Sequence, residues 1–177
     1  MEKTDFHLYL LFTLEKQYFG VNIHHVKQLL RLKEGTQQTG YIVINEEVST
    51  QTLSNMLDLK ESLFETGKAI PSENDKNYFQ PHLPTMIELI SPVLNSTEHT
   101  MGIIVDFIIG LQQIPPEDIN NTEPGQNHNS TDKRFITGYY MTPIMDRRGQ
   151  LKETMVSLIH LENLFARGVK MKMDKAS

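Results

Sequence analysis

The first part of the chain alternates apolar stretches with short polar breaks in a way that predicts a hairpin followed by a short helix. Residues 7–13 and 17–23 are rich in aromatic and branched side chains, and the polar pair Glu15-Lys16 lies between them. This pattern is typical of two strands joined by a tight turn. In residues 24–32 the apolar positions follow a mostly helical spacing, and Gly35 comes shortly afterwards. We therefore expect a short helix that ends before this glycine.

The middle of the chain is less regular. Residues 41–44 predict a strand, whereas residues 49–64 fit either a helix or a strand that closes at Leu57-Asp58-Leu59. From residue 65 to residue 84 the chain is polar and contains three prolines. A stretch of this kind predicts a long loop, and we expect it to separate two halves of the protein.

The next segments return to strand-like character. Residues 86–94 predict a strand, and residues 101–109 form a nearly continuous apolar run, which is typical of a strand buried in the core. Residues 120–133 are rich in Asn, Ser and Gly and low in hydrophobicity. They predict a mobile loop without chemistry of its own.

The last described pattern is a second hairpin with a helix behind it. Residues 135–141 and 154–159 predict two strands, and the turn-forming residues 146–149 lie between them. Residues 160–166 then predict a short amphipathic helix that Gly168 ends.

Together these elements predict a mostly β protein. We count eight or nine short strands, a few short helices and no repeated strand–helix unit, so a mostly antiparallel barrel or sandwich is the expected class. With 177 residues, the chain has room for one ordinary domain or for two small lobes that share a core.

Charge and cysteine content narrow the possible functions. The net charge of -5 gives no attraction for a phosphate backbone, so nucleic acid is not expected as the main partner. The absence of cysteine excludes disulfides, thiolate zinc sites and a cysteine nucleophile. The amino-terminal residues resemble no signal peptide, and no apolar run approaches the ~18 residues of a membrane helix. We expect a soluble protein of the reducing cytoplasm.

The usual signatures of enzymes and metal sites are missing. The chain has no phosphate-binding glycine loop and no paired histidines at metal-binding spacing, and the adjacent pair His24-His25 points its side chains apart on a helix. The acid pairs Glu46-Glu47 and Glu117-Asp118 lie in polar segments, and surface charge explains them better than catalysis. We expect no catalysis, no metal and no cofactor.

Asp106 differs from these residues because it stands inside the most apolar run of the chain. A buried carboxylate is costly unless hydrogen bonds compensate it. One interpretation is that Asp106 caps a turn or bonds backbone amides where the strand bends; another is that it points to solvent. The third is a ligand-binding or catalytic cleft between lobes, with His99 and the pair Tyr139-Tyr140 beside Asp106.

Four segments, in the same order along the chain, resemble the CheW family, the adaptor proteins of bacterial chemosensory arrays. The most specific match is Gly102-Ile103-Ile104-Val105-Asp106-Phe107-Ile108, which is similar to the family's G-I-V-V-D-x-V motif. The resemblance spans roughly residues 7–166, and its other segments are residues 9–14, residues 18–30, which hold Gln28 where the family's V-x-E-I motif has glutamate, and residues 135–138 with 155–165.

One family motif is absent. The family carries N-L-R-G followed by P-V-x-D-L, whereas this chain has Gly40-Tyr41-Ile42-Val43-Ile44-Asn45 and later Leu57-Asp58-Leu59. Alignment on Gly40 places Asn45 at the position of the family's arginine, whereas alignment on Asp58 places Thr50 there. An insertion of a few residues reconciles the two alignments. The chain is therefore identified as a diverged or specialised member, such as an adaptor of a pilus-motility pathway.

The resemblance implies a fold and a function. The fold is two small SH3-like five-stranded β-barrel lobes that share a core over residues 7–166, with residues 167–177 as a charged tail. The implied function is a noncatalytic adaptor, monomeric in isolation, that couples the cytoplasmic tip of a chemoreceptor to the regulatory domain of a CheA-type histidine kinase. The implied protein-binding residues are Val26, Gln28, Leu29, Asn45, Val105 and Asp106.

Some of these residues have a structural alternative. Val26, Leu29 and above all Val105 are also explained by core packing, and Gly102 and Gly138 by a close approach of two backbone segments. The rival hypothesis for the whole chain is a small β-barrel enzyme or ligand-binding protein that uses the cleft around Asp106.

Overall fold

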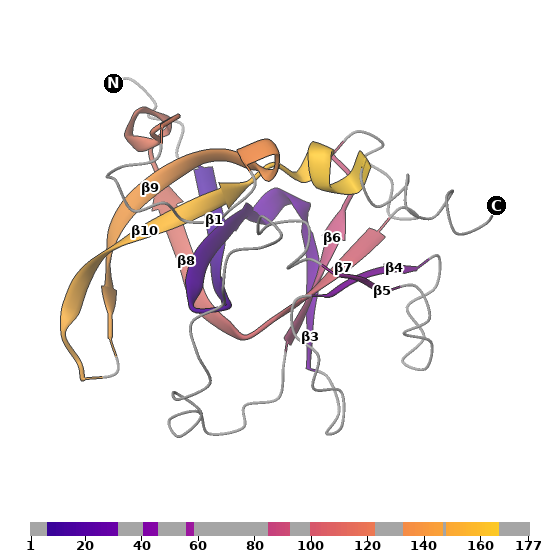
Figure 1. Cartoon of the computed structure of the whole chain (residues 1–177), viewed down its shortest axis with the longest axis horizontal. Helices are drawn as coiled ribbons and strands as arrows, with labels where there is room; N and C mark the ends of the chain where they lie inside the picture. The colour runs from indigo at the N-terminus through magenta and orange to yellow at the C-terminus, as the bar shows by residue number, and fades with distance from the viewer. Residues whose placement is uncertain are drawn as a thin grey trace.

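The computed structural model describes residues 7–31, 41–45, 56–58, 85–92, 100–122, 133–146 and 148–166. In these residues ten strands form two five-stranded sheets (Figure 1). The first sheet has the order β8-β1-β2-β10-β9, and the second has the order β3-β6-β7-β4-β5. The strands of the first sheet are β1 (His7–Leu14), β2 (Gln17–Asn22), β8 (Phe107–Ile114), β9 (Ile136–Met145) and β10 (Leu151–Ile159). Those of the second are β3 (Val26–Arg31), β4 (Tyr41–Asn45), β5 (Met56–Asp58), β6 (Thr85–Ile90) and β7 (Thr100–Val105).

Neighbouring strands run antiparallel, except that β2 and β10 pair in parallel. Short 3-10 helices join some of them: η1 (Ile23–His25), η3 (Pro116–Asp118) and η4 (Lys133–Phe135). An α-helix over residues 161–166 follows β10. The expected mostly β fold, with two curled SH3-like lobes and a few short helices, is confirmed.

The first sheet closes on itself through a bridge between Asn120 and Tyr139. Asn120 follows β8 and η3 at one edge of the sheet, and Tyr139 lies in β9 at the other edge. Each residue donates its backbone N–H to the carbonyl of the other, and both bonds are 2.8 Å long. The bridge removes part of the unpaired edge that an open sheet exposes.

Gly138 makes this closure possible. A Cβ atom on Gly138 would stand 2.5 Å from Cγ2 of Ile119 and 3.1 Å from the carbonyl oxygen of Asn120. Real Cβ atoms essentially never come within 2.5 Å of a methyl carbon, and 3.1 Å from a carbonyl oxygen is tighter than most Cβ contacts. The expected role of Gly138 in a close backbone approach is therefore what the packing shows.

Both faces of β1 are buried, and this joins the lobes. On one face, Leu10, Phe12 and Leu14 pack into a core shared by both sheets and by the helix over residues 161–166. On the other face, Leu11 packs inside the first lobe. The shared core also contains Phe19, Val21, Ile87, Leu89, Met101, Ile103, Val105, Phe135, Ile159, Leu161 and Leu164.

Most predicted elements are present. Four expected strands are present as β4, β6, β9 and β10, which correspond to the predictions at residues 41–44, 86–94, 135–141 and 154–159. In the ambiguous segment 49–64, residues 56–58 form the strand β5. The turn after β9 is built on Asp146, whose Oδ1 accepts the N–H groups of Arg148 and Gln150 at 2.8 Å and 2.9 Å. The loop expected over residues 65–84 lies outside the described residues, and so do residues 123–132 of the loop expected over residues 120–133. At the ends of that second loop, Asn120 lies in the bridge to Tyr139 and Lys133 begins η4.

Two predictions were wrong. The helix expected from residue 24 is instead η1 followed by β3, because Val26 and Leu29 pair with Leu89 and Ile87 of β6. Pairing with a neighbouring strand therefore overrides the local spacing. The apolar run over residues 101–109 is not one strand either, because the chain bends at Asp106 and divides into β7 and β8.

Candidate protein-binding site

Asp106 connects the bend between β7 and β8 to the turn between β1 and β2. Its backbone N–H donates to the carbonyl of Thr13 at 3.0 Å, and its Oδ2 accepts the backbone N–H of Glu15 at 2.8 Å. Glu15 and Lys16 both have positive φ, 50° and 64°, as a tight hairpin turn requires. The carboxylate therefore stabilises a strained turn, which is the turn-capping interpretation.

The cleft proposed around Asp106 loses its main support in this geometry. The carboxylate is engaged with backbone, and Tyr139 is buried at 5% exposure. Tyr140 packs, half-buried, against the interior of the first lobe. His99 lies outside the described residues.

The residues behind the first hairpin stand on β3, the edge strand of the second sheet. Gln28 and Leu29 are exposed, and Leu29 leaves 45% of its surface to solvent. Val26 is half-buried and packs against the shared core. We call Val26, Gln28 and Leu29 the β3 surface. An exposed leucine beside polar groups on an edge strand suits contact with another protein.

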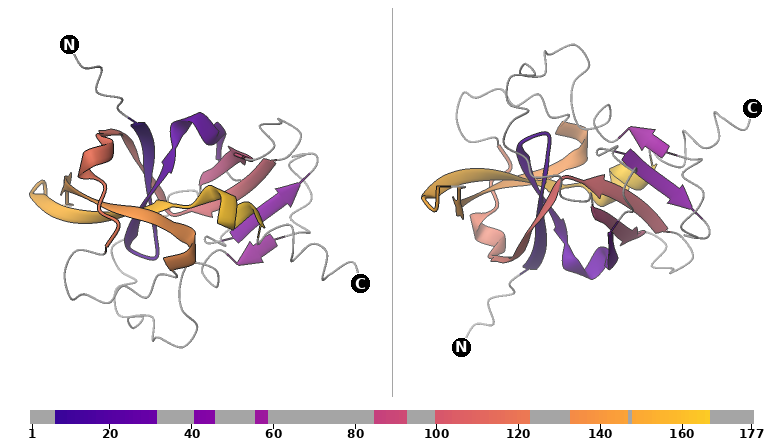
Figure 2. Two further views of the ribbon diagram at one scale, coloured as in Figure 1. Left: turned by 90° about the horizontal axis from the view of Figure 1, so that it is seen from above. Right: turned by 90° about the horizontal axis from the view of Figure 1, so that it is seen from below.

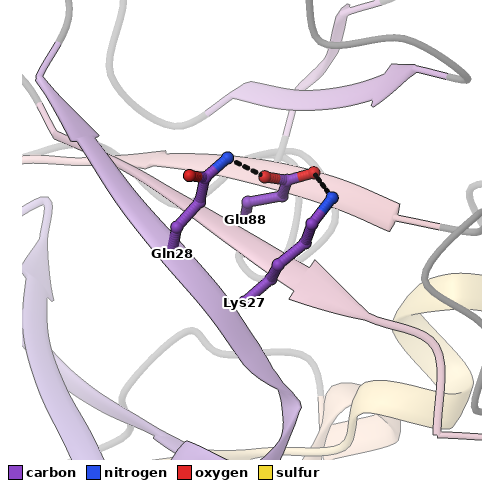
Figure 3. Close-up of polar contacts among 3 residues, drawn as sticks. All are labelled: Lys27, Gln28 and Glu88. Carbon is purple, nitrogen blue, oxygen red and sulfur yellow. Dashed lines mark hydrogen bonds and ion pairs between the residues drawn. The ribbon is translucent and has the colours of Figure 1, made fainter.

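A β-bulge shapes this strand. Val26 pairs with Leu89 and Gln28 pairs with Glu88, so Lys27 is an extra residue in the register. Consecutive residues of a regular strand point to opposite faces, whereas a bulge changes where side chains point. Here both Lys27 and Gln28 reach the carboxylate of Glu88 on β6 (Figure 3).

Glu88 is a buried charge with several partners. Its side chain is 1% exposed, and Lys27 Nζ donates to its Oε1 at 3.1 Å. Gln28 Nε2 donates to its Oε2, and the Thr100 side chain bonds the carboxylate as well. We call Lys27, Gln28, Glu88 and Thr100 the Glu88 cluster. It attaches the edge strand β3 to the interior strand β6.

The pKa of Glu88 depends on two opposing effects, burial of the carboxyl group and its interactions with the other residues of the Glu88 cluster. Burial by itself raises the pKa of a carboxyl group. The hydrogen bonds from Gln28, Lys27 and Thr100, together with the positive charge of Lys27, outweigh burial and lower the pKa of Glu88 below its ordinary value. The carboxylate is therefore ionised at neutral pH and holds its donors firmly.

The remaining predicted site residues are not all on one surface. Asn45 is on β4, where it pairs in register with Thr100 of the Glu88 cluster. Val105 is 0% exposed in the shared core, so its side chain is not available to a partner and core packing explains it. The alternative arginine position, Thr50, lies outside the described residues. The structure thus brings Val26, Gln28 and Leu29 together and leaves Val105 and Asp106 with structural roles.

Sequence reasoning missed Glu88 and Lys27. The signal that singled out Asp106 was also present at Glu88, which is the one charged residue in the apolar segment Met86-Ile87-Glu88-Leu89-Ile90. The bulge that turns Lys27 toward Glu88 has no comparable signature in the sequence.

Other kinds of site are absent from the part of the chain that the structure describes. Its histidine and acidic residues form no group of three that would hold a metal ion. Its helical segments are too short or too polar to traverse a lipid bilayer.

The fold defines the class of protein to which this chain is similar: two-lobed, mostly β proteins with a shared core. No protein-family model matches the chain, and no curated protein matches it in sequence. Among solved structures, the scaffolding protein TtCheW from Thermoanaerobacter tengcongensis has the same fold. The two align with a TM-score of 0.52 and 17% identity over 92% of this chain and 90% of that one.

Proposed function

We propose that this protein is a noncatalytic adaptor of a bacterial chemosensory array, located in the cytoplasm, which couples chemoreceptors to a CheA-type histidine kinase. The observation that carries the proposal is the shared two-lobed fold, which aligns with a scaffolding protein over 92% of the chain. The CheW-like motif around Asp106 supports it, since this aspartate occupies the bend between β7 and β8 and caps the hairpin turn.

The β3 surface is the contact that we assign to this function. Leu29 offers the apolar group, Gln28 is exposed beside it, and the Glu88 cluster holds the strand in place. Asn45, on β4, is the further candidate, because it replaces the family's arginine in one alignment. A contact built on one exposed leucine and polar neighbours is of the transient kind, for which we expect a dissociation constant of about 1–50 μM.

The test is a titration of the full chain against the regulatory domain of a CheA-type kinase from the same genome, and against a receptor cytoplasmic fragment, by calorimetry. Leu29→Glu should weaken binding to at least one of them roughly tenfold or more. The matched control is Leu111→Glu, which places the same change at a 58% exposed leucine on β8 of the other sheet. Circular dichroism of both variants shows whether the fold is retained.

Two outcomes contradict the proposal. If the wild-type chain binds neither fragment at tens of micromolar, the adaptor function is wrong and the fold similarity alone remains. If it binds but Leu29→Glu and Leu111→Glu behave alike, the adaptor function stands and the assignment of the β3 surface is wrong.

A further inference from the structure

The hairpin of β9 and β10 extends beyond the rest of the first sheet. β10 pairs with β9 along its whole length, from Leu151 to Ile159, but with β2 only from Val156 to Leu158. Residues 141–145 and 151–155 therefore form a two-stranded ribbon without a third strand among the described residues. Figures 1 and 2 show the far end of this ribbon extending beyond the other described strands.

Among the described residues, one face of the ribbon packs against the rest of the protein and the other face does not. On the inner face, Tyr140 and Ile144 pack against the interior of the first lobe, and Thr142 is 5% exposed. The outer face carries three cross-strand pairs, namely Met145 with Leu151 nearest the tip, Pro143 with Glu153 in the middle, and Met141 with Met155 nearest the sheet. We call these six residues the methionine face.

Five of the six residues on the methionine face are apolar, and three large ones are exposed to solvent, whereas Met155 is half-buried. Met145 is 65% exposed, Leu151 is 67% exposed and Met141 is 39% exposed. Large apolar side chains that form a contiguous exposed patch are a mark of an interaction site, whereas singly scattered ones are not. Methionine is also the side chain best able to adjust its shape to different partners.

The charge of Glu153 limits which binding partners can pack against the methionine face. It is the one charged residue on the face, it is exposed, and it lies between two apolar pairs. Among the described residues, no hydrogen bond or ion pair engages its carboxylate. Stacking a second copy on the same face would bring two carboxylates together in an apolar contact, which is unfavourable. The net charge of -5 on each copy adds to the repulsion.

The width of the two-stranded ribbon favours an α-helix as the bound partner segment. Two strands span about 10 Å, since neighbouring strands are about 4.8 Å apart, and this width matches the diameter of one α-helix. The edge of β9 is less suited to an added strand because Pro143 lacks the N–H that such pairing requires. We propose that the methionine face binds an amphipathic helix of a partner protein that carries one basic side chain within its apolar stripe, opposite Glu153.

The experiment uses the full chain and two synthetic helical peptides with the same apolar stripe of leucines. One peptide carries a lysine in the middle of the stripe and the other carries a glutamate there. Binding is followed by the NMR signals of the methionine methyl groups. We expect the lysine peptide to shift the signals of Met141, Met145 and Met155 and to bind about fivefold or more tightly than the glutamate peptide. The variant Glu153→Lys should reverse the preference.

Control variants separate this face from the β3 surface. Met145→Ser with Leu151→Ser should abolish binding of the lysine peptide, whereas Leu111→Ser and Leu29→Ser should leave it unchanged. All four substituted side chains are at least 45% exposed, so the fold should survive, and circular dichroism checks this.

Several results would overturn the inference. Equal binding of the two peptides would show that Glu153 selects nothing, and signal shifts outside the methionine face would place the contact elsewhere. No binding of either peptide at about 1 mM would show that the face accepts no helix. A dimer in sedimentation that Met145→Ser with Leu151→Ser abolishes would show that a second copy is the occupant.

Discussion

Glu15 and Asp106 are 91 residues apart in the sequence, and the backbone N–H of Glu15 donates to Oδ2 of Asp106 at 2.8 Å. This bond joins the first hairpin to the bend between the strands of the two lobes. It explains why a carboxylate occurs inside the most apolar segment of the chain. The bond also predicts how variants of Asp106 behave.

Asp106→Ala should lower the free energy of unfolding by about 1–2 kcal/mol, because the strained turn at Glu15 and Lys16 loses a charged acceptor. Asp106→Asn keeps an acceptor oxygen and should lose less. Urea unfolding of the three proteins measures the difference. An alanine variant within about 0.5 kcal/mol of the wild type would show that the bond contributes little.

Gln28→Glu, which introduces the glutamate of the V-x-E-I motif that this segment resembles, should destabilise this chain. It would place a second carboxylate beside the buried carboxylate of Glu88, to which Gln28 now donates. We expect a loss of about 1–3 kcal/mol in the free energy of unfolding. The double variant Gln28→Glu with Glu88→Gln exchanges the two groups and should recover part of this loss. If the effects of the two single variants simply add, the two side chains are not coupled.

Stability should fall in acid through Glu88. Its pKa is lowered in the folded state, so its contribution to stability is present above the unfolded pKa of about 4.3 and disappears as the pH falls through the folded pKa. Urea unfolding of the wild type and of Glu88→Gln across this range should show a difference at pH 7 that shrinks below about pH 4. A difference that stays constant with pH would mean that the ionisation of Glu88 is not linked to folding.

Gly138→Ala should be more harmful than Gly20→Ala, although both sites are buried. At Gly20 the nearest atom to an added Cβ is the flexible Cδ2 of Leu158, at 2.9 Å, whereas at Gly138 it is the β-branched Ile119, with the carbonyl of Asn120 behind it. We expect losses of about 1 kcal/mol at Gly20 and about 2–3 kcal/mol at Gly138 in the free energy of unfolding.

Thermal unfolding of the two variants provides the comparison. Adding Ile119→Ala to Gly138→Ala should restore part of the stability, because it removes the closest atom but leaves the carbonyl. Equal losses at the two glycines would show that the Asn120–Tyr139 bridge can shift to make room.

The helix expected from residue 24 shows where sequence reasoning stops. Val26, Leu29 and Leu30 are spaced as on one side of a helix, but the same residues suit an edge strand with a bulge. Leu29 remains 45% exposed, so the assumption that every leucine in the pattern faces a core does not hold there. The choice between the two structures depends on β6, which lies some 60 residues further along the chain.

The elements with local signals were predictable from the sequence alone: the first hairpin with its polar turn, the strand β4, the hairpin of β9 and β10 with its Asp146 turn, and the mostly β class. Apolar alternation and turn residues act over a few positions, so they can be read in order along the chain. The sequence also singled out Asp106, because an ionised side chain within an apolar segment needs hydrogen-bond partners in the folded protein.

The pairings between distant strands, and every feature that depends on these pairings, could be found only from the three-dimensional structure. The Glu88 cluster depends on the bulge in β3 opposite β6. The cap of the first hairpin turn depends on Asp106, which lies at the bend between β7 and β8. The methionine face depends on the cross-strand register of β9 and β10. These features arise because folding brings together residues that are far apart in sequence. Whether such residues meet is determined by the packing of the whole core, which no local pattern contains.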